Sequence, residues 1–109
     1  MKKLLIIVVF ILITLTLFGC GSDSLTLDTF ISNYENAGIS VDETKKPFSS
    51  MIGATDGVIF YMENQKVAIY EYKKEGDLKN ANFEFNSVNG RFGLESDNIE
   101  AKEIFDSVK

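Results

Sequence analysis

The apolar positions divide the chain into an unbroken N-terminal run and a longer part in which apolar and polar residues alternate. Between residues 4 and 18 only Thr14 and Thr16 are polar, and Lys2 and Lys3 precede this run. A membrane-spanning helix needs about 20 apolar residues, whereas the hydrophobic region of a secretory signal peptide has about 7–15. The run therefore predicts a signal peptide over residues 1–19, and the alternative is an uncleaved signal anchor.

The apolar run ends at a short motif that contains the only cysteine of the chain. Leu17-Phe18-Gly19-Cys20 resembles the lipobox of bacterial lipoproteins, although Phe18 stands where a smaller residue is more usual. In that family the cysteine sulfur receives a diacylglycerol, and cleavage makes this cysteine the new N-terminus. The resemblance implies cleavage between Gly19 and Cys20 and lipidation of Cys20. It also implies a lipid-anchored protein at the extracytoplasmic face of the cell membrane, with a short tether over residues 20–26.

Two later segments have the apolar spacing of amphipathic helices. In residues 27–37 one stripe repeats every three or four positions, Thr26 is the expected N-cap and Gly38 the expected stop. Residues 98–108 carry a second apolar stripe, and Asp97 and Glu100 would form a capping box at the start of this helix. A short helix capped by Asp77 is expected over residues 78–81.

The segments 58–62 and 67–72 are rich in β-branched and aromatic residues and predict a β-hairpin. A two-residue loop at Asn64-Gln65 would sort the side chains into two sets. One face would carry Phe60, Met62, Val67 and Ile69, and the other Ile59, Tyr61, Ala68, Tyr70 and Tyr72. A one-residue slip would mix these sets, so the register of the hairpin stays open.

Asn89-Gly90 is a strong hairpin signal, because both residues tolerate the positive φ angles of a type I′ turn. Pairing around this turn would place Ser87 opposite Phe92 and Phe85 opposite Leu94. Phe83 would then share a face with Phe85, Phe92 and Leu94. The alternative is a longer helix that includes residues 82–88.

These elements, with a short strand expected over residues 39–42, give the order α-β-ββ-(α)-ββ-α. We therefore expect an α+β fold: an antiparallel sheet of about five strands with two main helices packed on one face. A single small domain over residues 27–109 would contain all of these elements.

Composition excludes several classes of function. The chain has no His and one Cys, so Ser-His-Asp or Cys-His catalysis, an imidazole metal site and a structural zinc site are not expected. Residues 20–109 carry nine basic and sixteen acidic residues, a net charge of −7 that opposes binding to nucleic acid. We expect no enzyme, no cofactor and no metal, and we keep a small hydrolase only as a distant alternative because acidic residues are plentiful.

Two groups of side chains are candidates for function. Tyr61, Tyr70 and Tyr72 would crowd one sheet face, where they could form a partner or glycan face, or else pack beneath a loop. Four acidic residues near the last helix could suggest a cation site, but capping and a solvated helix face explain them better. These acidic residues are Asp97, Glu100, Glu103 and Asp106.

Val-Ala-Ile-Tyr-Glu-Tyr at 67–72 and Asn-Gly-Arg-Phe at 89–92 resemble segments of small envelope lipoproteins of Gram-positive bacteria. The resemblance implies a cell-surface location and carries no site residue. We expect a lipid-anchored, non-catalytic module that binds another envelope protein. An exclusion or immunity role, as in some small lipoproteins, would fit this expectation. The alternative is a wall-glycan or peptide-binding module that uses exposed tyrosines.

Overall fold

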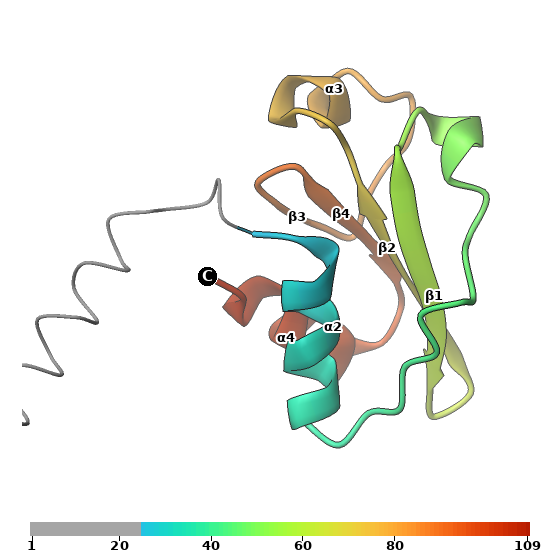
Figure 1. Cartoon of the computed structure of the whole chain (residues 1–109), viewed down its shortest axis with the longest axis vertical. Coiled ribbons are helices and arrows are strands. Elements are labelled where there is room, and N and C mark those ends of the chain that lie inside the picture. Colours follow the sequence, from blue (N-terminus) through green and yellow to red (C-terminus); the bar gives the residue numbers. More distant parts are fainter. Residues whose placement is uncertain (1–24) are drawn as a thin grey trace, which may run out of the picture.

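The computed structural model describes residues 25–109, so the expected signal peptide, Cys20 and most of the tether lie outside the described residues (Figure 1). Four strands form an antiparallel sheet in the order β1-β2-β4-β3. The elements in chain order are α2 (Leu27–Asn36), the 3-10 helix η2 (Ser49–Ile52), β1 (Asp56–Met62), β2 (Gln65–Glu71), α3 (Glu75–Lys79), β3 (Ser87–Asn89), β4 (Phe92–Ser96) and α4 (Ile99–Ser107). The α+β class and the antiparallel sheet are confirmed, and the described sheet has four strands instead of about five.

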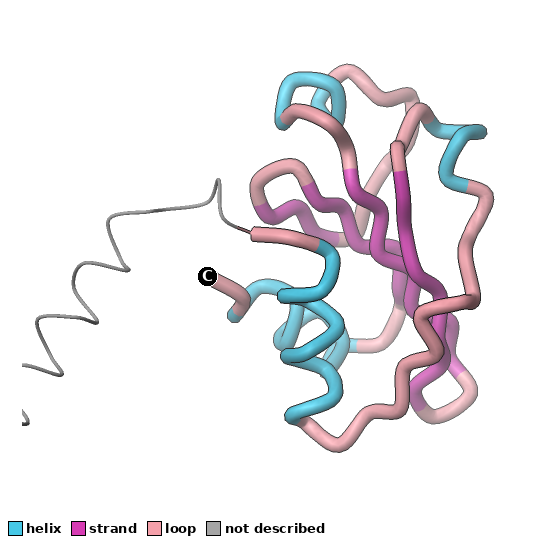
Figure 2. Tube along the Cα trace, in the orientation of Figure 1, coloured by secondary structure: helices cyan, strands magenta, loops and turns pink. Residues whose placement is uncertain are grey.

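Helices α2 and α4 pack together on one face of the sheet, which we call the helix face (Figure 2). The Tyr34 hydroxyl joins them, because it donates a hydrogen bond of 2.6 Å to the Ala101 carbonyl. The expected apolar stripes of both helices lie in this core. Its strand residues are Val58, Phe60, Met62, Val67, Ile69, Phe92 and Leu94.

Local capping signals explain where the helices begin and end. Thr26 and Thr29 form a reciprocal capping box at the start of α2, and Gly38 after its end has a φ of 88°. The cap of α4 differs from the prediction by one residue: the Asn98 side chain, and not Asp97, accepts a hydrogen bond from the Ala101 N–H at 2.8 Å. An amide oxygen caps a helix as effectively as a carboxylate, so the sequence alone did not separate these neighbours.

The β1–β2 hairpin turns at Glu63-Asn64, one residue earlier than predicted. Both residues have positive φ, 51° and 68°, as a type I′ turn requires. Phe60 therefore pairs with Val67, which was expected opposite Met62. This is a shift of two positions in the partner strand, and side chains alternate with a period of two, so the predicted sets of face residues are unchanged.

The second hairpin turns at Gly90-Arg91, and Ser87 pairs with Leu94 instead of Phe92. Strand β3 begins only at Ser87, so Phe83 and Phe85 do not join the helix face as predicted. They cross to the opposite face of the sheet, which we call the outer face, and pack there against Tyr70. Gly93 makes this possible, because a Cβ atom built on it would lie 2.6 Å from the Phe85 ring.

Two further predictions are wrong in detail. Residues 39–42 are not a strand, although Ile39 and Val41 pack against the core of the helix face, which explains the alternating pattern. Helix α3 covers Glu75–Lys79 with Lys74 at its N-cap, so it begins earlier than Asp77 would allow as a cap. The segment 82–86 is irregular, and neither the strand nor the helix expected there extends through it.

We expect Gly57→Ala to destabilise the domain by about 1–3 kcal/mol, because the added Cβ has no space. It would lie 2.8 Å from the Ile69 carbonyl oxygen and 2.9 Å from Pro47 Cγ. Gly76→Ala is the matched control, since nothing lies within 4 Å of its Cβ position. Urea unfolding should show a loss for Gly57→Ala and none for Gly76→Ala, and equal midpoints for the two variants would contradict this packing.

Candidate functional site

The two ends of the sheet differ in how the outer face is covered. The proximal end is marked by the β1–β2 pair Asp56 and Glu71, and residues from η2, α3 and the segment 81–85 cover the outer face there. The distal end is marked by the turn Glu63-Asn64 and lies about 20 Å away along β1. Tyr61 at the distal end is 64% exposed, so the outer face is open there.

This open area, which we call the distal surface, crosses β1, β2 and β4 and reaches the start of α4. The outer face carries Tyr61, Lys66 and Glu95 there, and we include in the distal surface Gln65, Asp97 and Ile99, which lie at the same end of the sheet. The Asn98 side chain donates a hydrogen bond of 2.9 Å to Gln65 Oε1, which holds the start of α4 beside β2. A hollow of about 330 Å³ lies between the strands and residues 84–86, with Tyr61 and Ile99 outside its lining.

An ion pair holds the middle of the distal surface. Lys66 Nζ lies 3.1 Å from Glu95 Oε2, and the Tyr70 hydroxyl donates to Glu95 Oε1 at 3.1 Å. The Glu95 carboxylate therefore has a partner on each oxygen, and its position is fixed by two residues of the neighbouring strand. The Lys66–Glu95 pair thus gives the surface an ordered polar part, and Tyr61 and Ile99 add two large exposed side chains to it.

The three tyrosines of the predicted face do not form an open platform. Tyr72 lies under η2, where its hydroxyl donates to the Ile52 carbonyl at 2.7 Å, and Tyr70 packs against Phe83 and Phe85. Both are buried, and only Tyr61 is exposed. A stacking platform for sugar needs several open rings, so these residues give the glycan alternative little support.

Burial and the neighbouring Glu95 carboxylate raise the pKa of Tyr70 to about 12 from its ordinary value of 10.0. Burial also raises the pKa of Tyr34 and that of Tyr72. In the unfolded chain these phenols lose their protons near pH 10, whereas the folded protein holds them to higher pH. For Tyr70 this stabilising contribution is therefore complete below about pH 10 and is lost as the pH rises through about 12.

We expect the free energy of unfolding to fall between about pH 10 and about pH 12. Urea titrations across this range should show a smaller fall for Tyr70→Phe than for the native protein, because the variant has no phenolic proton at this position. The same pH dependence in both proteins would mean that Tyr70 is not held protonated by its surroundings.

Comparison with protein-family models, with curated proteins and with solved structures finds no match to the chain. The site is therefore argued from the geometry of residues 25–109 alone. None of the helices in this range is long and apolar enough to cross a bilayer.

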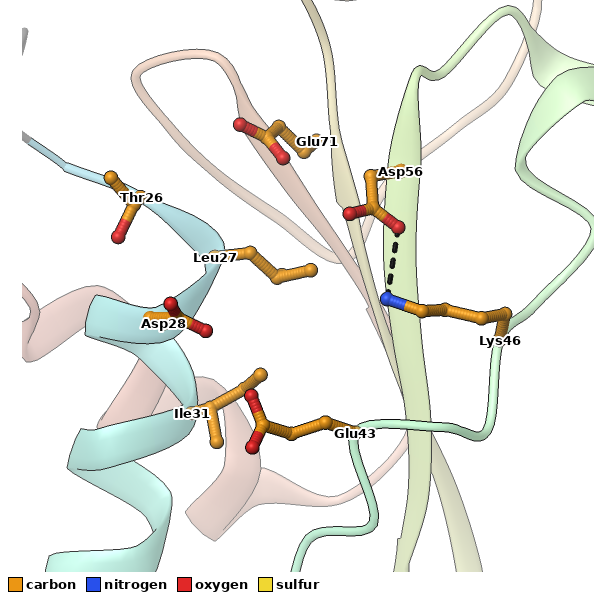
Figure 3. A pocket seen from close by; sticks show the side chains of 8 residues that line it. All are labelled: Thr26, Leu27, Asp28, Ile31, Glu43, Lys46, Asp56 and Glu71. Atoms are coloured by element: carbon orange, nitrogen blue, oxygen red, sulfur yellow. Dashed lines mark hydrogen bonds and ion pairs between the residues drawn. The ribbon is translucent and has the colours of Figure 1, made fainter.

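A second hollow, of about 220 Å³, lies between the start of α2 and the proximal end of β1 (Figure 3). Four carboxylates line it, and Lys46 is the only basic residue among the lining side chains. Lys46 Nζ lies 3.0 Å from Asp56 Oδ1, and Arg91 pairs with Glu71, so two of the four carboxylates have a cation beside them. The acidic residues are Asp28, Glu43, Asp56 and Glu71.

The acidic residues near α4 are dispersed and do not converge on one point. Asp97 belongs to the distal surface, Glu100 and Glu103 are exposed, and Asp106 pairs with Lys102 at 2.8 Å. Within the described part of the chain, no three His, Cys, Asp or Glu side chains are grouped as a metal site.

Three exposed apolar residues were not expected from the sequence. Ile99 is 76% exposed, and Phe48 and Met51 on η2 are about as open to solvent. Ile99 does not belong to the apolar stripe of its helix, and this position in the sequence already indicates exposure to solvent. Phe48 and Met51 follow a proline in a segment without periodicity, so their exposure could not be predicted from the sequence.

Proposed function

We propose that the protein is a lipid-anchored, non-catalytic module at the extracytoplasmic face of the cell membrane, which binds another envelope protein through the distal surface. The lipid anchor would be on Cys20, as the lipobox resemblance implies. One observation carries the assignment of the surface: two large exposed side chains, Tyr61 and Ile99, lie at the same end of the sheet as the Lys66–Glu95 ion pair. Protein interfaces commonly combine such apolar contacts with hydrogen-bonded polar groups.

The edge of β1 adds to this surface. The Ile59 N–H points away from β2 and donates to the Lys45 carbonyl at 3.0 Å. Tyr61, two residues further, therefore presents its backbone groups on the same outer edge. No strand among residues 25–109 pairs with this edge, since β1 is the outermost strand of the sheet. An extended segment of a partner can bind such an edge through main-chain hydrogen bonds.

Charge indicates the kind of partner. Glu84, Glu95 and Asp97 line the distal hollow, and Lys66 is the only basic residue in its lining. Since Lys66 already pairs with Glu95, the remaining charge is negative. A partner surface with basic residues around an apolar contact would be complementary, and such complementarity contributes mainly to specificity and association rate. Confinement near the membrane would let even a weak contact of this kind act.

Photo-crosslinking in intact cells tests this proposal. A crosslinking amino acid replaces Tyr61 in one variant and Ile99 in another, and Val88 is the control position. Val88 is 49% exposed and lies on β3, the strand at the opposite edge of the sheet. We expect Tyr61 and Ile99 to give an adduct with the same envelope protein and Val88 to give none. Different adducts at the first two positions, or an equal yield at Val88, would contradict the assigned surface.

A further inference from the structure

The 3-10 helix η2 holds two large apolar side chains in the solvent. Phe48 is 82% exposed and Met51 is 80% exposed. The turn that carries them is tied to the sheet, because the Ile52 carbonyl accepts a hydrogen bond of 2.7 Å from the Tyr72 hydroxyl. Within the turn, the Ala54 N–H donates to the Ser49 carbonyl at 3.0 Å. Phe48 and Met51 are therefore presented on an ordered turn.

Basic residues surround this apolar turn. Lys45 and Lys46 precede it in the chain, and Lys73 and Lys74 follow the end of β2, which lies beside η2 because the Thr55 N–H donates to the Glu71 carbonyl at 2.8 Å. All four lysines are exposed. Lys46 pairs with Asp56, whereas the other three form no ion pair within residues 25–109. These three lysines thus flank the turn, and exposed carboxylates of Glu43, Glu75 and Asp77 lie in the same two segments.

The chain enters the domain at the same end of the sheet. Arg91 Nη2 donates to the Leu25 carbonyl at 3.1 Å, and Nη1 donates to the Tyr72 carbonyl at 2.9 Å. Leu25 is therefore held close to the residue that directly precedes Lys73. Four residues lie between Cys20 and Leu25, and even a fully extended chain over these five steps spans only about 17 Å. A lipid on Cys20 would keep the proximal end near the bilayer.

We propose that Phe48 and Met51 insert into the interfacial region of an anionic lipid leaflet, while Lys45, Lys73 and Lys74 contact its headgroups. This inference rests on the proposed lipid anchor at Cys20. Apolar side chains flanked by lysines suit the boundary between headgroups and acyl chains, where the apolar part is buried and the charge stays in the polar layer. Together with the lipid anchor on Cys20, this contact orients the domain, so that the distal surface points away from the membrane toward a partner.

A single tryptophan reports this contact, because the native chain contains no Trp. The lipidated full-length protein, with Phe48→Trp, is reconstituted into vesicles of phosphatidylglycerol and phosphatidylethanolamine that carry bromine on their acyl chains. Tyr61→Trp is the matched control, since this aromatic residue is also exposed but lies at the distal end. Co-flotation with the vesicles and the mass of the N-terminal Cys20 confirm the anchor independently of the fluorescence.

We expect the Phe48→Trp emission to shift to shorter wavelength and to be quenched by the brominated lipid, while Tyr61→Trp stays solvent-like and unquenched. Lys73→Gln and Lys74→Gln should each lower the ratio of membrane-bound to free domain orientations by about five-fold on anionic vesicles, and by less on phosphatidylcholine. Anchored protein without quenching at Phe48→Trp would overturn this inference alone. A blue shift without bromine quenching would indicate self-association and would also overturn it. Failure of co-flotation would refute the anchor instead.

Discussion

Replacing Phe30 by alanine is expected to cost about 3–5 kcal/mol of unfolding free energy, because it removes the ring at the centre of the helix-face core. Phe30 is fully buried, and its ring centroid lies 4.5 Å from that of Phe92 and 4.9 Å from that of Phe105. It therefore connects α2 to both β4 and α4. A domain of this size typically has a total stability of roughly 4–13 kcal/mol, so the variant should be largely unfolded at moderate urea concentrations.

Phe48→Ala is the control for Phe30→Ala, because it removes the same ring from a position that is 82% exposed. In detergent solution its unfolding free energy should stay within about 0.5 kcal/mol of the native value. Urea unfolding followed by circular dichroism measures both variants. A similar loss in the two proteins would show that Phe30 is not the central residue of the core.

Arg91→Ala is expected to cost about 2–3 kcal/mol, since one side chain holds three groups together. Arg91 pairs with the Glu71 carboxylate at 2.5 Å and donates to the Leu25 and Tyr72 carbonyls, while its guanidinium lies 4.7 Å from the centre of the Phe92 ring. The pair is largely shielded, with side-chain exposures of 27% for Arg91 and 19% for Glu71. Removal of the guanidinium leaves a shielded carboxylate without its cation.

Lys102→Ala is the matched control, because it breaks an exposed ion pair with Asp106 that is worth about 0.3–0.5 kcal/mol. Hydrogen exchange adds a local readout. In Arg91→Ala, exchange should accelerate in the first turn of α2, where the Leu25 carbonyl has been released, and it should be unchanged there in Lys102→Ala. Equal unfolding free energies for the two variants would contradict the role of Arg91 in fixing where the chain enters the domain.

The elements that the sequence predicted well are those with local signals. The stripe of α2, its Thr26 cap and its Gly38 stop all lie within one segment of the chain, and each acts through its near neighbours. The face residues of the first hairpin were also predictable, because alternation alone sorts them. Its turn was not, since Glu63 takes a positive φ that its residue type does not favour.

The outer face could not be predicted from local signals. Phe83 and Phe85 have the spacing of strand residues, yet they lie outside the strands and pack against Tyr70 on the outer face. This packing depends on the space that Gly93 leaves on a strand distant in sequence from Tyr70. For the same reason the burial of Tyr70 and Tyr72 depends on contacts between distant segments, and the candidate face of three tyrosines was reduced to Tyr61.

The distal surface also depends on tertiary placement. The Asn98 side chain binds Gln65, a residue 33 positions earlier in the chain, and this contact holds the start of α4 beside β2. Neither residue carries a sequence signal for this contact. The N-terminal motif can be recognised without knowledge of the fold, because a lipobox is defined by consecutive residues. The proposed position at the membrane thus depends on residues 17–20, and the proposed partner surface depends on the sheet.

The central proposal is that a lipid on Cys20 holds this domain at the outer face of the membrane, and intact mass measurement of the membrane-extracted protein tests it most directly. We expect a chain that begins at Cys20, lacks residues 1–19 and carries the added mass of a diacylglycerol with its acyl chains. The Cys20→Ala variant should keep residues 1–19 and gain no lipid mass. A native protein with the mass of the unmodified chain from Met1 to Lys109 would contradict the account.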